Sequence, residues 1–169
     1  MYTSILAFAL AGFFPPANSI ATPTWLTDYS AAKSLGAKES KPLAVFLGSG
    51  SEGWNKLSRE GSLSAIAKSV LAEKYICVHI DTGTQKGKSL ADAFEIRGGL
   101  GIIVSDRTGQ VQAFRHEGDL VDSNLIQYLQ KYGDPTYVAR ATESNPGERV
   151  SNYSPGYSLA PASYSNCPT

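Results

Sequence analysis

The sequence predicts an α/β domain with a mixed central sheet that carries helices on both faces. Two continuous apolar runs, residues 43–47 and 75–80, are bounded by Pro, Gly or Asp and are typical of strands buried on both faces. Residues 62–75 lie between them with apolar side chains at helical spacing, and this strand–helix–strand order favours a parallel pair. Residues 101–105 and 110–114 follow as two strands joined by a tight turn, which predicts an antiparallel hairpin.

Three further helices complete the predicted domain. They are expected at residues 28–35, 88–94 and 122–132, and a short helix is expected to start at residues 54–59 after a glycine-rich loop. Asp134-Pro135 ends the last helix, because the residue before a proline is disfavoured in the α conformation.

The charged residues are confined to the middle of the chain. Fifteen Lys and Arg balance fifteen Asp and Glu in 169 residues, and all of them lie between Asp28 and Arg149. The length suits one domain with terminal segments. A net charge of zero argues against a nucleic-acid partner bound by counterion release. Two cysteines exclude a disulfide-dense miniprotein and a zinc site made of four cysteines.

The amino-terminal residues 1–21 suit a secretory signal peptide. Residues 5–14 form an apolar run that Pro15-Pro16 ends, and Ser19-Ile20-Ala21 offers the small residues that a signal peptidase reads. The run is shorter than the roughly 20 residues of a membrane-spanning helix, so no stable membrane span is expected in the mature chain. The sequence therefore predicts export, to the periplasm or the medium. A buried terminal helix or a misassigned start is the alternative, because residues 1–4 carry no Lys or Arg.

The predicted domain occupies residues 22–137. A flexible tail rich in Ser, Pro and Tyr is expected at residues 138–169, because the apolar periodicity ends there and residues 151–169 contain no charge.

Several short features resemble the thioredoxin-like group of proteins. They are distributed along the chain from the first helix to the hairpin turn: Trp25, Asp28-Tyr29, Lys41-Pro42, Asp81, residues 94–98 and Gly109. The resemblance covers about residues 23–132 and extends to small exported members of planctomycete type. It implies a thioredoxin fold for this chain.

The resemblance also implies where a redox site would lie. Members of the group carry a C-x-x-C motif just after the first buried strand, and counting from Lys41-Pro42 places the motif on Glu52, Gly53, Trp54 and Asn55. A thiolate is the nucleophile in disulfide exchange, and neither a carboxylate nor an amide replaces it.

Two other positions of the group can be compared in the same way. Its cis-proline falls on Leu100, and its buried acid falls on Phe46. The resemblance therefore implies the fold without its reaction, which favours a non-catalytic module for binding or scaffolding.

The glycine-rich loop allows a second interpretation. Gly48-Ser-Gly-Ser-Glu-Gly53 matches G-x-G-x-x-G between a strand and a helix, which is the context of a dinucleotide-binding loop. The next acid, Asp81, lies further along the chain than the usual distance of about 20 residues. We therefore favour a permissive strand-to-helix loop and keep a nucleotide-binding protein as an alternative.

The cysteines and histidines are interpreted structurally. Cys77 is expected to be a buried, inert thiol, His79 a packed core histidine, and His116 part of a solvated polar loop. A divergent thiol-disulfide oxidoreductase that uses Cys77 or Cys167 is the enzymatic alternative. We expect no cofactor and no metal site, because no local cluster offers three ligands. Trp54 is a candidate contact to another protein.

Overall fold

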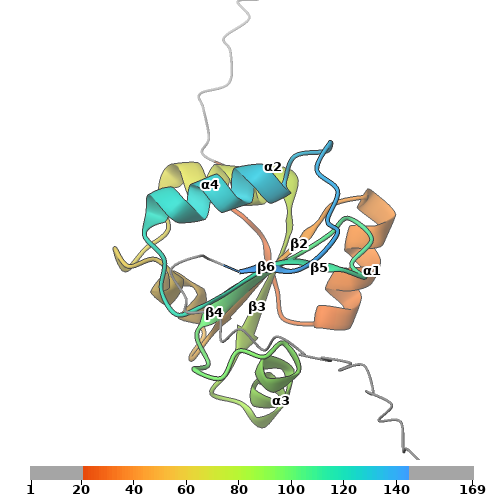
Figure 1. Cartoon of the computed structure of the whole chain (residues 1–169). Helices are drawn as coiled ribbons and strands as arrows, with labels where there is room; N and C mark the ends of the chain where they lie inside the picture. The colour runs from red at the N-terminus through yellow and green to blue at the C-terminus, as the bar shows by residue number, and fades with distance from the viewer. Residues whose placement is uncertain (1–20, 145–169) are drawn as a thin grey trace, which may run out of the picture.

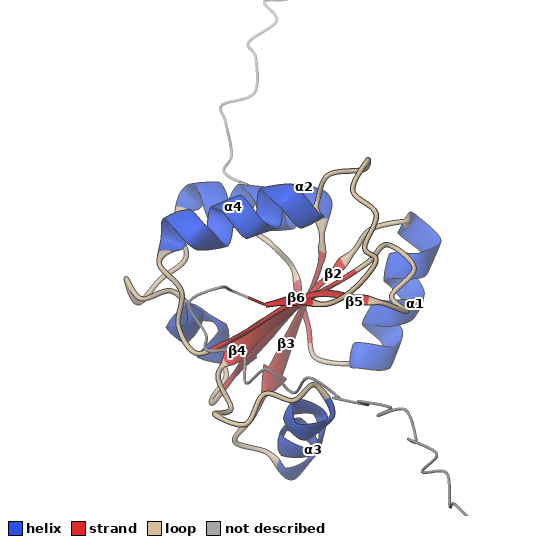
Figure 2. Cartoon of the chain, in the orientation of Figure 1, coloured by secondary structure: helices blue, strands red, loops and turns tan. Residues whose placement is uncertain are grey.

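A mixed sheet of six strands forms the centre of the protein (Figure 2). The computed structural model describes residues 21–144, so residues 1–20 of the predicted signal peptide and residues 145–169 of the predicted tail lie outside the described part. The strands stand in the order β1-β3-β2-β4-β5-β6. Their bounds are Trp25–Leu26 for β1, Leu43–Gly48 for β2, Ile76–Asp81 for β3, Gly101–Ser105 for β4, Gln112–Glu117 for β5 and Glu143–Ser144 for β6.

The strand directions follow the predicted pairing. β3 is parallel to both β1 and β2, and β4 is antiparallel to both β2 and β5. β6 adds a short parallel strand beside β5. The carboxyl ends of β2 and β3 therefore meet at one edge of the sheet, beside the amino end of β4. The predicted α/β fold class is confirmed.

Helices cover both faces of the sheet (Figure 1). In the described part of the chain they are α1 (Tyr29–Glu39), the 3-10 helix η1 (Gly53–Leu57), α2 (Ala65–Lys74), α3 (Gln85–Ala93) and α4 (Asp122–Tyr132). α2 and α4 pack together on one face, and α1 and α3 lie on the other. No helix within residues 21–144 is long and apolar enough to cross a membrane.

Alternate side chains of the strands build two separate cores. Phe46 and Ile102 face the layer of α2 and α4, where Leu71 and Leu125 pack against them. Val45, Val78 and Ile103 face the layer of α1 and α3. All six residues of β2 are buried, as the continuous apolar run predicts for a central strand.

Polar side chains determine where three helices begin. Asp28, Ser64 and Thr84 each accept a hydrogen bond from a backbone N–H in the first turn of the helix that follows. The Thr84 hydroxyl accepts from the Gly87 N–H at 3.0 Å, so α3 begins at Gln85 and not at the predicted residue 88.

β5 starts and ends later in the chain than the predicted 110–114. Asp106 causes the shift, because its carboxylate accepts the N–H groups of Gln110 and Val111 at 3.0 and 3.1 Å and holds both residues in the turn. The later end brings His116 into the sheet, where 7% of its surface is exposed. The prediction of a solvated loop at His116 is therefore wrong.

The apolar pattern does not predict β1 or β6, which have two residues each. β6 lies in the segment assigned to the tail, yet it pairs with β5. The Glu143 carboxylate accepts hydrogen bonds from the hydroxyls of Tyr132 and Tyr137, both at 2.8 Å, and forms an ion pair with Lys131. These contacts hold β6 on the domain beyond residue 137.

Candidate functional site

The loop after β2 folds back tightly on the end of the strand. Gly48 and Gly53 lie so close that a Cβ atom added to Gly48 would stand 2.6 Å from the Gly53 carbonyl carbon. Glu52 precedes η1 as its cap residue but makes no capping bond with its side chain. The Lys56 ammonium donates to the Ser49 carbonyl oxygen at 3.0 Å. The two outer glycines of the G-x-G-x-x-G match therefore allow a close backbone approach.

Asp81, at the end of β3, ties this loop to the next one. Its Oδ1 accepts hydrogen bonds from the N–H groups of Gly50 and Gly83, both at 2.8 Å. These two bonds hold the pKa of the Asp81 carboxyl below its ordinary value, so the group is ionised at neutral pH. A negative carboxylate thus occupies the Gly50 donor and would repel a phosphate there, which disfavours nucleotide binding by this loop.

Trp54 belongs to an aromatic cluster at the carboxyl end of β2. Its ring stacks on Trp25 with centroids 4.8 Å apart and planes at 21°, and Trp25 meets Phe46 edge to face at 5.0 Å. Phe46 is fully buried, whereas both tryptophans are half-buried. Phe46, at the position matched to the buried acid of the group, thus packs against the stacked pair of tryptophans. Each partly exposed indole combines a large apolar ring with a polar N–H group.

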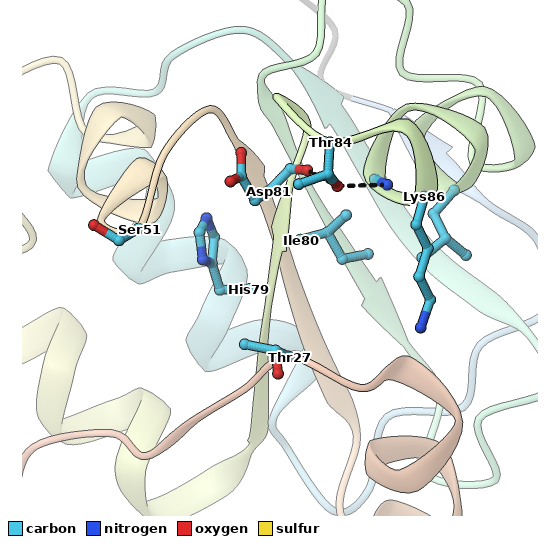
Figure 3. A pocket seen from close by; sticks show the side chains of 9 residues that line it. Thr27, Ser51, His79, Ile80, Asp81, Thr84 and Lys86 are labelled. Atoms are coloured by element: carbon cyan, nitrogen blue, oxygen red, sulfur yellow. Dashed lines mark hydrogen bonds between the residues drawn. The ribbon is translucent and has the colours of Figure 1, made fainter.

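A cavity of about 360 Å³ opens beside β3, close to the same loop (Figure 3). We call it the β3 notch; its walls include Thr27, Ser51, His79, Ile80, Asp81 and Lys86. In Figure 3, His79 lies on the same side of β3 as Ser51, and Ile80 and Lys86 lie on the other side. The notch therefore reaches around the edge of the sheet and has two chemically different sides.

His79 is buried, as predicted, with 5% of its surface exposed. Its Nε2 lies 3.3 Å from the Gly48 carbonyl oxygen, which only accepts, so Nε2 carries the proton of the neutral ring. Nδ1 then bears a lone pair and has no hydrogen-bond partner within residues 21–144. One wall of the β3 notch therefore presents hydrogen-bond acceptors.

Cys77 is a buried thiol inside β3, as predicted. Its exposed fraction is 2%, and its Sγ lies 3.7 Å from the Leu71 carbonyl oxygen, to which it donates. Burial raises the pKa of the thiol to about 12, so the thiolate is scarce at neutral pH. Cys167 lies outside the described residues.

Leu100 is half-buried and directly precedes β4. Its carbonyl oxygen accepts from the Gly118 N–H at 2.9 Å, and no peptide bond within residues 21–144 is cis. His116 does not approach the notch, because Phe46 of β2 and Ile102 of β4 stand between it and His79 in the sheet register. Its Nε2 lies 3.1 Å from the Asp119 carbonyl oxygen.

The structure places the four residues matched to the C-x-x-C motif at the start of η1. It brings together with them two groups that are distant in the sequence, Trp25 from β1 and Asp81 from β3. The sequence pattern does not predict the β3 notch. The one signal of it in the sequence is Asp81, an acid directly after the apolar run 75–80. No group of three or more His, Cys, Asp or Glu side chains within the described residues could hold a metal ion.

Solved structures with the same architecture identify the fold. A DsbH oxidoreductase superposes with a TM-score of 0.52 at 16% identity, covering 74% of this chain and 93% of that one. A thioredoxin from Thermus thermophilus superposes with a TM-score of 0.50 at 16% identity, covering 64% of this chain and 85% of that one. No protein-family model and no curated protein matches the sequence. The strand order and these similarities show that the chain contains a thioredoxin-like domain.

Proposed function

We propose that this protein is an exported thioredoxin-fold module that binds another protein and does not exchange disulfides. The observation that carries the proposal is the half-buried stack of Trp25 and Trp54 at the carboxyl end of β2. Thiols are expected at this place in redox-active members of the group. Here the loop carries Glu52 and Asn55 at the matched positions.

The chemistry of the thiols supports a module without dithiol activity. Disulfide exchange needs an accessible thiolate, and the Cys77 thiol is buried with a pKa raised to about 12. Phe46 is apolar and fully buried, so it relays no proton to the loop. Cys167 is a single thiol with no matched partner in a C-x-x-C motif.

The geometry of the tryptophans supports a role in binding. Tryptophan is enriched among the residues that contribute most to protein interfaces, because it buries a large area with few rotatable bonds. The stack on Trp25 and the contact of Trp25 with Phe46 already hold the rings in place. A partner that covers Trp54 therefore loses little free energy to ordering this surface.

Disulfide reduction provides the first test. The full chain is mixed with insulin and dithiothreitol, and precipitation of the insulin chains is followed against a Cys77→Ser, Cys167→Ser double variant. We expect identical rates from both proteins. A faster rate from the unmodified chain would establish the enzymatic alternative.

Site-specific cross-linking tests the binding surface. A p-benzoylphenylalanine placed at Trp54 is compared with one at Ile66, which is 59% exposed on α2. We expect a discrete protein adduct in cells from position 54 and none from position 66. Adducts from both positions, or from neither, would contradict a binding surface at the tryptophans.

The proposed export is based on the apolar run at residues 5–14 and the small residues before Thr22. We expect the mature chain to begin near Thr22. Amino-terminal sequencing of protein recovered from the periplasm or the medium checks this, and a product that begins at Met1 would refute it.

A further inference from the structure

We propose that the β3 notch binds an extended segment of the partner protein and places a lysine or arginine of that segment against Asp81 and His79. This inference rests on the proposed function, because it specifies the chemistry of a protein partner. It depends on three observations, which concern the backbone of β3, the two sides of the notch and its size.

The first observation is an open edge on β3. Toward β2, the Ile76 N–H donates to the Pro42 carbonyl oxygen at 3.0 Å. The Thr82 N–H donates to the Gly48 carbonyl oxygen at 3.2 Å. Hydrogen-bonding directions alternate along a strand, so the intervening odd-numbered residues turn their backbone groups toward β1. β1 is paired only with Cys77 and Val78. The His79 carbonyl and the Asp81 N–H therefore have no strand beside them within residues 21–144.

An open edge of this kind accepts another strand. A peptide that runs along it can donate to the His79 carbonyl and accept from the Asp81 N–H, which extends the sheet beyond the end of β1. The stretch from His79 to Asp81 measures about 10 Å along the strand, so it accommodates a short segment.

The second observation is the charge on each side of the notch. On the side of His79, the free lone pair of Nδ1 and the ionised Asp81 carboxylate are acceptors, and the Ser51 hydroxyl lies on the same side. An ammonium or guanidinium group supplies the donors that these groups need. Lys56 also acts electrostatically on Asp81, and its ammonium is engaged by the Ser49 carbonyl oxygen.

The opposite side fits a different residue of the same segment. Ile80 and Leu90 form an apolar wall there, and Lys86 lies at its end on α3. Successive side chains of an extended segment point to opposite sides. A basic residue facing Asp81 is therefore expected to have an aliphatic neighbour against Ile80 and an acidic neighbour near Lys86.

The third observation is the size of the notch. A cavity of about 360 Å³ is within the range of ligand pockets, which begins at about 300 Å³. It accommodates one long basic side chain with part of the adjoining backbone. The unpaired edge, the acceptor side and the volume thus indicate the same occupant.

A synthetic peptide tests the proposal on the full chain. The probe is Ac-Ser-Glu-Lys-Val-Ser-NH2, and its control carries norleucine in place of lysine. Binding is followed by amide chemical shifts of the labelled protein. We expect saturable shifts at Thr27 and from His79 to Lys86, with a dissociation constant near or below about 1 mM. The norleucine peptide is expected to bind at least about tenfold more weakly.

Two matched variants separate the notch from general electrostatics. Asp81→Asn keeps an oxygen for the N–H groups of Gly50 and Gly83 but removes the charge, so it is expected to weaken the lysine peptide at least about tenfold. Glu73→Gln removes an exposed charge on α2 and is expected to leave peptide binding unchanged. A native amide spectrum of the Asp81→Asn variant shows that its fold is retained.

Several results would overturn the inference. These are no saturable shifts up to about 5 mM peptide, equal binding by Asp81→Asn, or shifts centred on Trp54. A dimer in sedimentation that Asp81→Asn abolishes would assign the notch to a second copy. Tighter peptide binding by a chain that begins at Thr22 would assign it to the chain's own first residues. Reduction of insulin would refute the proposed function and leave the peptide result unchanged.

Discussion

Replacing Gly48 by alanine tests whether the glycine spacing of the loop after β2 serves packing. Gly48 ends β2, and its Cα faces the backbone of Gly53 at the start of η1. A Cβ atom on Gly48 would lie 2.6 Å from the Gly53 carbonyl carbon, whereas ordinary contacts begin at 3.4 Å. The backbones must therefore separate by about 1 Å, and neither has a side-chain rotamer that can relieve the contact.

The expected loss of stability follows from this overlap. Overpacking in a dense interior costs about 1–3 kcal/mol, and a clash between two backbone segments belongs at the upper end of that range. We expect Gly48→Ala to reduce the free energy of unfolding by about 3 kcal/mol. For a domain of this size, that loss lowers the melting temperature by about 10 °C. Gly53→Ala should act similarly, because its Cβ would stand 2.5 Å from the Gly48 carbonyl oxygen.

Gly50→Ala is the matched control within the same loop. Its Cβ would meet nothing within 4 Å, but its φ of +91° is unfavourable for alanine, so we expect a loss of about 1 kcal/mol. Urea unfolding monitored by tryptophan fluorescence gives all three values. If Gly48→Ala unfolds within about 0.5 kcal/mol of the unmodified protein, or is more stable than Gly50→Ala, the packing role of Gly48 is refuted.

Three further predictions concern Glu143, Cys77 and the positions matched to the C-x-x-C motif. Hydrogen bonds from Lys131, Tyr132 and Tyr137 hold the pKa of Glu143 below its ordinary 4.5. The ionised carboxylate therefore stabilises β6 above that pH, and this contribution disappears as the pH falls through the lower pKa of the folded protein. Hydrogen exchange should show β6 losing protection in acid, and Glu143→Gln should remove this pH dependence. In a Cys167→Ser variant, Cys77 should resist iodoacetamide at pH about 8 in the folded protein and react fully in urea, so rapid labelling of that native variant would contradict the inertness of Cys77. A Glu52→Cys, Asn55→Cys variant should form an internal disulfide in air because both positions lie at the start of η1; mass spectrometry that finds no bond between them would show that the matched register is wrong.

The apolar pattern alone predicts the central sheet and its helical layers. β2, β3 and β4 are buried on both faces over almost their whole length, so most of their residues are apolar and the runs are visible without any tertiary information. The burial of Cys77 and His79 follows from the same runs. The absence of thiols at the positions matched to the C-x-x-C motif is likewise a property of the sequence, although the match itself stays a prediction.

Other features of the fold and the site depend on contacts between segments that are distant in the chain. β1 and β6 have two residues each, too few for a period, and they exist as strands because β3 and β5 lie beside them. His116 is buried because the Asp106 side chain lengthens the hairpin turn and moves the end of β5. The β3 notch arises where β1 stops pairing with Val78, and its acceptors gather there because Asp81 bonds to two loops at once. Local periodicity reports which residues are buried, whereas an open strand edge and its charges are created only when separate segments meet.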